Sequence, residues 1–182
     1  SDTERTAEST GEATQNTAPT SEANTQQEKK VLRTAIVYSP VTGIAADLST
    51  APDEGFAEGM MGEGAVVTPK DPVICAPEDG EVEFIFDTKH AIGLATESGL
   101  ELLIHIGVDT VELGGKFYTA HVKDGDVVKK GQTLITFDMD AIKTAGYDVT
   151  TPLIVTNTDD YEEVKMLAEG TVNNGSEVLE VK

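Results

Sequence analysis

Residues 88–113 read TKHAIGLATESGLELLIHIGVDTVEL, and this stretch contains two of the three histidines of the 182-residue chain, His90 and His105. Two apolar runs flank a short polar segment, a pattern typical of two antiparallel strands joined by a tight turn. With a two-residue turn, His90 lies directly opposite His105 and both imidazoles point to one face of the hairpin. A three-residue loop ending at Gly99 shifts the register by one residue and turns the rings apart. The sequence does not choose between the two registers.

The pattern of this hairpin recurs throughout residues 31–182. Short apolar runs rich in Val, Ile and Thr are bounded by Gly, Pro and Asp, for example TAIVYSP (34–40), EVEFIF (81–86) and TLITFD (133–138). Such runs predict an all-β fold, an antiparallel β-sandwich or barrel. One or two short helices are expected, in DMDAIKTAGY (138–147) and in DDYEEVKMLAEG (159–170).

Two segments of the chain are weakly repeated. SPVTG (39–43) resembles APEDG (76–80), and GDVVKKGQTLITFD (125–138) resembles GTVNNGSEVLEV (170–181). Pro-x-x-Gly also marks tight turns in unrelated strands. We favour an internally duplicated β motif.

The first thirty residues differ in composition from the rest. Residues 1–30 contain no Val, Leu, Ile, Met or aromatic residue, so burial cannot offset the entropy of ordering them. They are predicted to be a disordered polar linker, followed by one domain at 31–182. The only cysteine, Cys75, is expected to be buried on a strand, and the absence of a disulfide framework fits a reducing cytoplasm.

The net charge of −20 restricts the partners that this protein can have. Nucleic acid and anionic lipid both require a basic surface, so neither is expected. No apolar run reaches the length of a membrane span, and no membrane insertion is expected. A basic protein partner fits this charge best.

The two histidines suggest chemistry when they lie together. Two facing imidazoles cannot both be charged at low cost, so at least one has a neutral ring nitrogen, which is a nucleophile or a metal ligand. An apolar surrounding that includes Phe84 and Phe86 suits a partner whose reactive group must be shielded from water. The plain alternative is two ordinary structural histidines. His121 has no partner in sequence and is expected on a surface strand.

Three stretches together resemble a known family: LELLIHIGVDTVEL (100–113), DTKHAIGL (87–94) and FAEGMMGEGAVVTP (56–69). They are similar to the glucose-type enzyme IIA domain of the bacterial phosphoenolpyruvate-dependent sugar phosphotransferase system, and the resemblance extends over residues 31–182. It implies a β-sandwich that accepts a phosphoryl group from the histidine-containing phosphocarrier protein. The group then passes to a cysteine of a IIB domain for sugar uptake.

The resemblance also implies roles for individual residues. His105 is the phosphorylated residue, reacting through Nε2, while the Gly107 carbonyl holds its other nitrogen. His90 donates a hydrogen bond to the phosphoryl oxygens, and the Thr88 hydroxyl orients it. The partner-docking face comprises Asp53, Phe56, Met61, Phe86, Leu103, Ile106, Asp109 and Val111. One departure is GGKFYTAHV (114–122), where Phe117 lies near a usual glycine, so a reshaped loop is expected beside the site.

The resemblance further implies a cytoplasmic domain tethered to the membrane through a fused permease; a free-standing protein with a polar arm is the alternative. No cofactor is required, although a zinc ion bridging His90 and His105 is chemically reasonable. A lysostaphin-like zinc endopeptidase is the competing enzyme class. His105 and Asp109 have its His-x-x-x-Asp spacing, but the chain has no His-x-His pair. A regulatory module that reports phosphorylation without transferring it is the third class.

Overall fold

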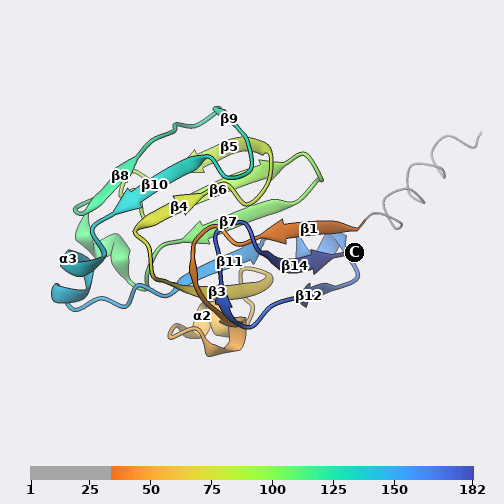
Figure 1. The fold of residues 1–182 in the computed structure, drawn as a ribbon, viewed down its shortest axis with the longest axis horizontal. Helices are drawn as coiled ribbons and strands as arrows, with labels where there is room; N and C mark the ends of the chain where they lie inside the picture. Colours follow the sequence, from red (N-terminus) through yellow and green to blue (C-terminus); the bar gives the residue numbers. More distant parts are fainter. Residues whose placement is uncertain (1–33) are drawn as a thin grey trace, which may run out of the picture. The chain divides into compact units, whose positions relative to one another are not determined.

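Antiparallel strands make up nearly all of the regular structure in the computed structural model, which describes residues 34–182 (Figure 1). The largest sheet has the order β13-β2-β3-β11-β7-β6-β5-β9, with the bounds Gly170–Val172, Gly43–Asp47, Glu63–Pro69, Thr151–Val155, Glu101–His105, Ala91–Thr96, Gly80–Ile85 and Val127–Val128. A second sheet has the order β1-β14-β12, Ala35–Tyr38, Glu177–Val181 and Val164–Met166. The third has the order β4-β10-β8, Val73–Cys75, Thr133–Phe137 and Tyr118–Ala120. The predicted linker at residues 1–30 lies outside the described part of the chain.

The helices are short. They are α2 (Glu54–Ala57), α3 (Met139–Thr144) and the 3-10 helices η1 (Leu48–Thr50), η2 (Thr110–Leu113) and η3 (Thr158–Asp160). Within residues 34–182, none of them has the length and apolar character needed to span a membrane. Helix α3 confirms the prediction for 138–147, and the Asp138 carboxylate caps it by accepting the Ala141 N–H at 3.0 Å.

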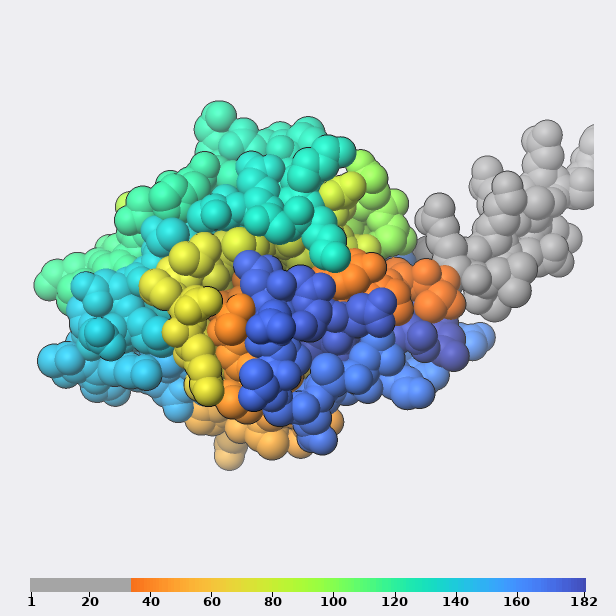
Figure 2. Space-filling view, viewed as in Figure 1, coloured from red at the N-terminus to blue at the C-terminus, as the bar shows by residue number. Residues whose placement is uncertain are grey.

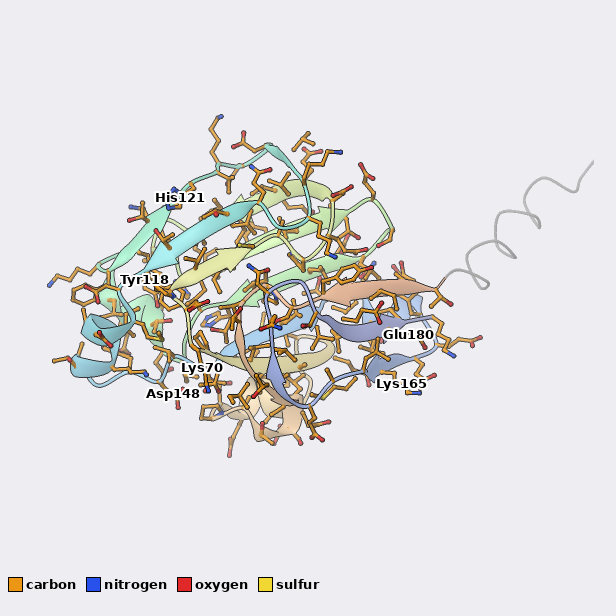
Figure 3. The ribbon with its side chains drawn as sticks, viewed as in Figure 1. Lys70, Tyr118, His121, Asp148, Lys165 and Glu180 are labelled. Atoms are coloured by element: carbon orange, nitrogen blue, oxygen red, sulfur yellow. The ribbon has the colours of Figure 1, made fainter. Side chains whose placement is uncertain are left out.

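The helical prediction for 159–170 is wrong over most of its length. Only η3 at its start is helical, and strand β12 follows. In β12, Lys165 lies opposite Glu180 and Met166 opposite Leu179 of β14. Figure 3 labels Lys165 and Glu180 on these neighbouring strands. Pairing with β14 therefore decides the conformation of a segment whose own helix propensity is only a weak preference.

One hydrophobic core joins the three sheets. Its buried side chains come from the large sheet (Leu102, Ile104), from the second sheet (Leu179) and from the third (Leu134, Ile135). The sheets therefore pack face to face, as expected for a sandwich. Figure 2 shows the first and last strands, orange and blue, side by side on the surface, in agreement with the pairing of β1 and β14. Cys75 is buried at the end of β4, as predicted.

The repeated sequence segments occupy equivalent places. Each Pro-x-x-Gly turn joins two strands, β1 to β2 in one copy and β4 to β5 in the other. The Ser39 carbonyl accepts the Gly175 N–H at 2.9 Å, and the Ala76 carbonyl accepts the Gly131 N–H at 2.8 Å. These four residues are matched in the two sequence repeats, so the structure confirms the duplicated β motif.

The hairpin register based on a two-residue turn is wrong. Ala91 lies opposite His105 and Ala95 opposite Glu101, and the Thr96 N–H donates to the Leu100 carbonyl at 2.9 Å. A three-residue loop therefore separates the strands. It ends at Gly99, whose φ of +94° is readily adopted only by glycine.

Candidate functional site

A second, smaller core lies on the outer face of the large sheet. Because side chains alternate along β7, Leu103 points away from the main core, toward the segment that contains η1 and α2. Phe56 of α2 packs in this second core, and Figure 1 shows α2 beside β3 and β11. His105 follows Leu103 by two residues and shares its face. The segment over the sheet thus forms one wall of the site.

His105 is held by the bend that follows its own strand. Its Nδ1 lies 2.7 Å from the carbonyl oxygen of Gly107. A carbonyl only accepts hydrogen bonds, so Nδ1 carries the proton in neutral His105 and Nε2 carries the lone pair. Gly107 has φ +91°, and a Cβ there would lie 2.5 Å from Cγ2 of Thr110. The bend therefore requires glycine at this position.

His90 lies outside the strand, which is why the register does not separate the rings. The turn before β6 contains Lys89 in the left-handed region, φ +59°, so strand alternation does not govern His90. The His90 carbonyl accepts the Ile106 N–H at 2.6 Å. Oγ1 of Thr88 lies 2.8 Å from His90 Nδ1. When this hydroxyl donates, Nε2 of His90 carries the proton.

The two rings meet edge to face. Their centroids are 4.7 Å apart at an angle of 81°. Both Nδ1 atoms have partners, whereas neither Nε2 has one within residues 34–182. No buried side-chain nitrogen or oxygen in that range lacks a partner, so neither Nε2 atom is completely enclosed by the protein. The expectation that the shifted register turns the rings apart is therefore wrong.

Both imidazoles are neutral near pH 7. His90 is only 1% exposed. This burial, with a smaller effect from the adjacent His105, lowers the pKa of His90 to about 4. Burial also lowers the pKa of His105. The hydrogen bond to Gly107 opposes this shift, as do the carboxylates of Asp53 and Asp109. A neutral His105 leaves the Nε2 lone pair free for nucleophilic attack.

An aromatic ring packs next to each of the two histidines. The Phe56 ring lies 5.0 Å from the His105 ring, and the Phe86 ring lies 5.4 Å from the His90 ring. Phe84 stacks on Phe86 at 5.5 Å. These rings surround the pair with apolar surface on the outer face of the sheet.

The predicted docking residues fall into two groups. Phe86 and Val111 are 46% and 52% exposed, and Met61 is similarly exposed in the segment that follows α2. Leu103 and Ile106 are 4% and 0% exposed. The prediction that Leu103 and Ile106 offer contact surface is therefore corrected, because Leu103 is packed in the second core and Ile106 in the main core. Phe56 is also buried and supports His105 from the side.

Two acidic residues lie near His105. Asp53 accepts the Phe56 N–H at 3.1 Å and caps α2. Asp109 is exposed on the bend, with φ +61°. Both carboxylates raise the pKa of His105, so both lie within electrostatic reach of the imidazole.

The reshaped loop lies beside the turn that carries His90, since a Cβ on Gly115 would lie 3.8 Å from Cα of Thr88, whereas the third histidine lies elsewhere. Phe117 has φ +76°, the conformation that a glycine would adopt without cost. His121 is exposed directly after β8, and its Nε2 lies 2.8 Å from Oγ1 of Thr136. Figure 3 labels His121 close to Tyr118 of β8. His121 takes no part in the ring pair.

Sequence reasoning missed two residues that support the site. The hydroxyls of Thr110 and Tyr118 both donate to the Ile106 carbonyl, at 2.7 and 2.8 Å. Tyr118 comes from β8, and no local sequence signal connects it to His105. Only the tertiary fold brings its hydroxyl to this carbonyl.

A metal centre of three protein ligands is not present in the described residues. No group of three His, Cys, Asp or Glu side chains in 34–182 is arranged to hold a metal ion. The two Nε2 atoms could supply two ligands, and a third would have to come from water or another molecule. The ligand set of a zinc endopeptidase is therefore not assembled here.

Comparisons with known proteins place this chain in a family. Residues 35–161 match the family described as phosphoenolpyruvate-dependent sugar phosphotransferase system, EIIA 1. The chain is 46% identical over 146 residues to the PTS system glucose-specific EIIA component of Oceanobacillus iheyensis, covering 80% of this chain and 88% of that protein.

A longer relative and a solved structure are also similar. Identity is 45% over 151 residues to the PTS system beta-glucoside-specific EIIBCA component of Dickeya chrysanthemi, covering 83% of this chain but only 24% of that protein. The glucose permease IIA from Mycoplasma capricolum superimposes with a TM-score of 0.76 at 32% identity, covering 82% of this chain and 97% of that one.

Proposed function

Because this chain belongs to the EIIA 1 family of the phosphoenolpyruvate-dependent sugar phosphotransferase system, we propose that Nε2 of His105 is the atom that carries its phosphoryl group. One observation supports this assignment above the others. The Gly107 carbonyl binds the Nδ1–H of His105, and this leaves a free Nε2 lone pair beside the second imidazole.

The transfer needs no proton from the protein. The Nε2 lone pair of His105 attacks the phosphorus of the donor phosphohistidine, and an N–P bond forms. The donor N–P bond breaks, and its electron pair returns to the donor imidazole. Positioning and charge stabilisation then account for most of the catalysis.

His90 is suited to stabilise the phosphoryl group. With Thr88 donating to Nδ1, Nε2–H of His90 is free to donate to a phosphoryl oxygen. A hydrogen bond to an ionised acceptor is stronger than a neutral one. His90 thus stabilises the negative charge of the phosphoryl group for as long as the group is bound to His105.

The surface around His90 and His105 indicates which partners can dock there. Exposed Phe86 and Val111 provide apolar contact area, and Asp53 and Asp109 provide negative charge. We infer that the phosphocarrier protein and a IIB domain dock here in turn, each through apolar side chains and arginines. The beta-glucoside relatives carry the letters IIBCA in their names. They support a IIB partner and a tether to a membrane permease.

Domains of this family need no cofactor. Zinc bridging of the two Nε2 atoms stays a prediction, and it would compete with phosphorylation because both need the same lone pair.

The test is a phosphorylation assay with mapping of the labelled residue. The protein is incubated with radiolabelled phosphoenolpyruvate, enzyme I and the phosphocarrier protein. We expect an acid-labile label on His105 that His105→Ala abolishes. His121→Ala is the matched control and should be labelled fully. A label on another residue would contradict the proposal. Binding of the phosphocarrier protein without any labelling of this protein would contradict it as well.

A further inference from the structure

The bend after β7 contains backbone conformations that need outside support. Gly107 and Asp109 have φ values of +91° and +61°, and the left-handed region is unfavourable for residues other than glycine. The bend nevertheless has to keep one shape, because its Gly107 carbonyl accepts the Nδ1–H of His105.

Two buried hydroxyls hold the peptide group that precedes Gly107. Oγ1 of Thr110 and Oη of Tyr118 both donate to the Ile106 carbonyl, at 2.7 and 2.8 Å. Thr110 lies at the end of the bend itself, whereas Tyr118 belongs to β8 of the third sheet. Burial raises the pKa of Tyr118, so its hydroxyl remains a protonated donor. The Tyr118 hydrogen bond therefore ties the bend to an independent part of the fold.

A second anchor holds the peptide group that follows Gly107. The Val108 N–H donates to the Asp148 carbonyl at 2.9 Å. This N–H shares its peptide plane with the Gly107 carbonyl, so the bond helps to aim that carbonyl. Figure 3 labels Tyr118 and Asp148 at the same end of the domain. The two anchors thus fix the peptide groups on both sides of Gly107.

We propose that Tyr118 is a positioning residue for the phosphoryl transfer described above, on which this inference rests. By holding the Ile106 carbonyl, it fixes the bend that presents the Gly107 carbonyl to His105 Nδ1. It thereby keeps His105 in the tautomer whose Nε2 is nucleophilic. Tyr118 touches neither imidazole and acts only through the backbone.

The variant that tests this role is Tyr118→Phe. The ring can still pack beside Phe137, whose ring centroid lies 6.3 Å away, and Thr110 still donates to the same carbonyl. Proton–nitrogen correlation spectra, recorded well above both histidine pKa values, report which nitrogen of His105 carries the proton. We expect nearly all Nδ1–H in the wild-type protein and a measurable fraction of Nε2–H in Tyr118→Phe. Acceptance of the phosphoryl group should slow roughly two- to tenfold, the range of one net hydrogen bond.

Tyr147→Phe is the matched control. It removes a tyrosine hydroxyl that lies 3.3 Å from Oε2 of Glu112, with no contact to the Ile106 carbonyl. It should keep both the wild-type tautomer and the wild-type rate. A Tyr118→Phe protein that folds and matches this control in both measurements would overturn the proposal.

A second variant keeps the test decisive if Tyr118→Phe does not fold. Thr110→Val removes the other hydroxyl from the same carbonyl with little change of shape. Tyr118 is then the remaining side-chain donor to this carbonyl, so the wild-type tautomer should be largely kept. Loss of the Nδ1–H tautomer in Thr110→Val would show that Tyr118 does not hold the bend and would overturn the proposal. The tautomer is measured without phosphoryl transfer. A wild-type protein that is not labelled on His105 would therefore remove the proposed function, while the spectra still decide the role of Tyr118.

Discussion

His90 and His105 have the same side chain but different tasks, because their Nδ1 atoms meet different partners. The carbonyl of Gly107 can only accept, which leaves a lone pair on Nε2 of His105. The hydroxyl of Thr88 can donate, which leaves a proton on Nε2 of His90. One nitrogen is suited to attack phosphorus and the other to bind its oxygens.

His90→Gln should separate acceptance from onward transfer. Nε2 of His105 remains free, so we expect phosphorylation of His105 to persist. Transfer to a IIB domain should slow by about tenfold or more, because a charge-assisted hydrogen bond is lost. Single-turnover rates of both steps measure this. Equal slowing of both steps would contradict the division of roles.

The lowered pKa of His90 should make stability depend on pH. The pKa falls from 6.5 in the unfolded chain to about 4 in the folded protein, so the unfolded state binds more protons between these values. The contribution of His90 to the free energy of unfolding is therefore fully present above pH 6.5 and is lost as the pH falls toward 4, by about 3 kcal/mol. Urea unfolding over this range should show a shallower dependence in His90→Gln. Identical slopes in the two proteins would show that His90 titrates normally.

At the scale of elements, the β6–β7 hairpin shows what the sequence could predict. The two strands follow from their apolar runs, but the loop length does not, because Glu97–Gly99 supports either turn. The rings meet despite the shifted register, since Lys89 adopts a left-handed conformation that no pattern indicates. The hairpin pattern singled out the two histidines and the family resemblance gave them roles, whereas the register in which the rings meet was predicted incorrectly. Tyr118 lies on another sheet and had no signal at all.

Gly107→Ala should destabilise the bend strongly. An added Cβ would lie 2.5 Å from Thr110 Cγ2 and 2.9 Å from the Asp148 carbonyl, in a left-handed residue. We expect a loss of about 2 to 4 kcal/mol in the free energy of unfolding. Gly125→Ala is the control, because Gly125 has φ +88° with no atom within 4 Å of the added Cβ. It should cost only about 1 to 2 kcal/mol. Equal losses would mean that the bend is not closely packed.

At the scale of the whole domain, the duplicated motif was predictable and the strand order was not. Pro-x-x-Gly turns and matched strands are visible in the sequence. The position of β11 between β3 and β7 depends on pairings between distant segments, which local periodicity does not encode. The helical prediction for 159–170 was wrong for the same reason, because β14 recruits part of that segment as a strand.

The net charge of the chain should control how fast partners arrive. At −20, the protein attracts a partner that docks through arginines, and salt screens this attraction. We expect the association rate with the phosphocarrier protein to fall about tenfold between low and high salt. Stopped-flow measurements over a salt series record this rate. A rate that stays constant would show that apolar contact alone guides docking.

The position of the phosphoryl group on the ring tests the site most directly. The nitrogen-labelled protein is phosphorylated through the phosphocarrier protein, and nitrogen–phosphorus coupling then identifies the bonded atom. We expect the bond at Nε2 of His105, with Nδ1 still protonated and a new hydrogen bond from Nε2 of His90. Phosphorus bonded to Nδ1 of His105, or to either nitrogen of His90, would contradict this arrangement.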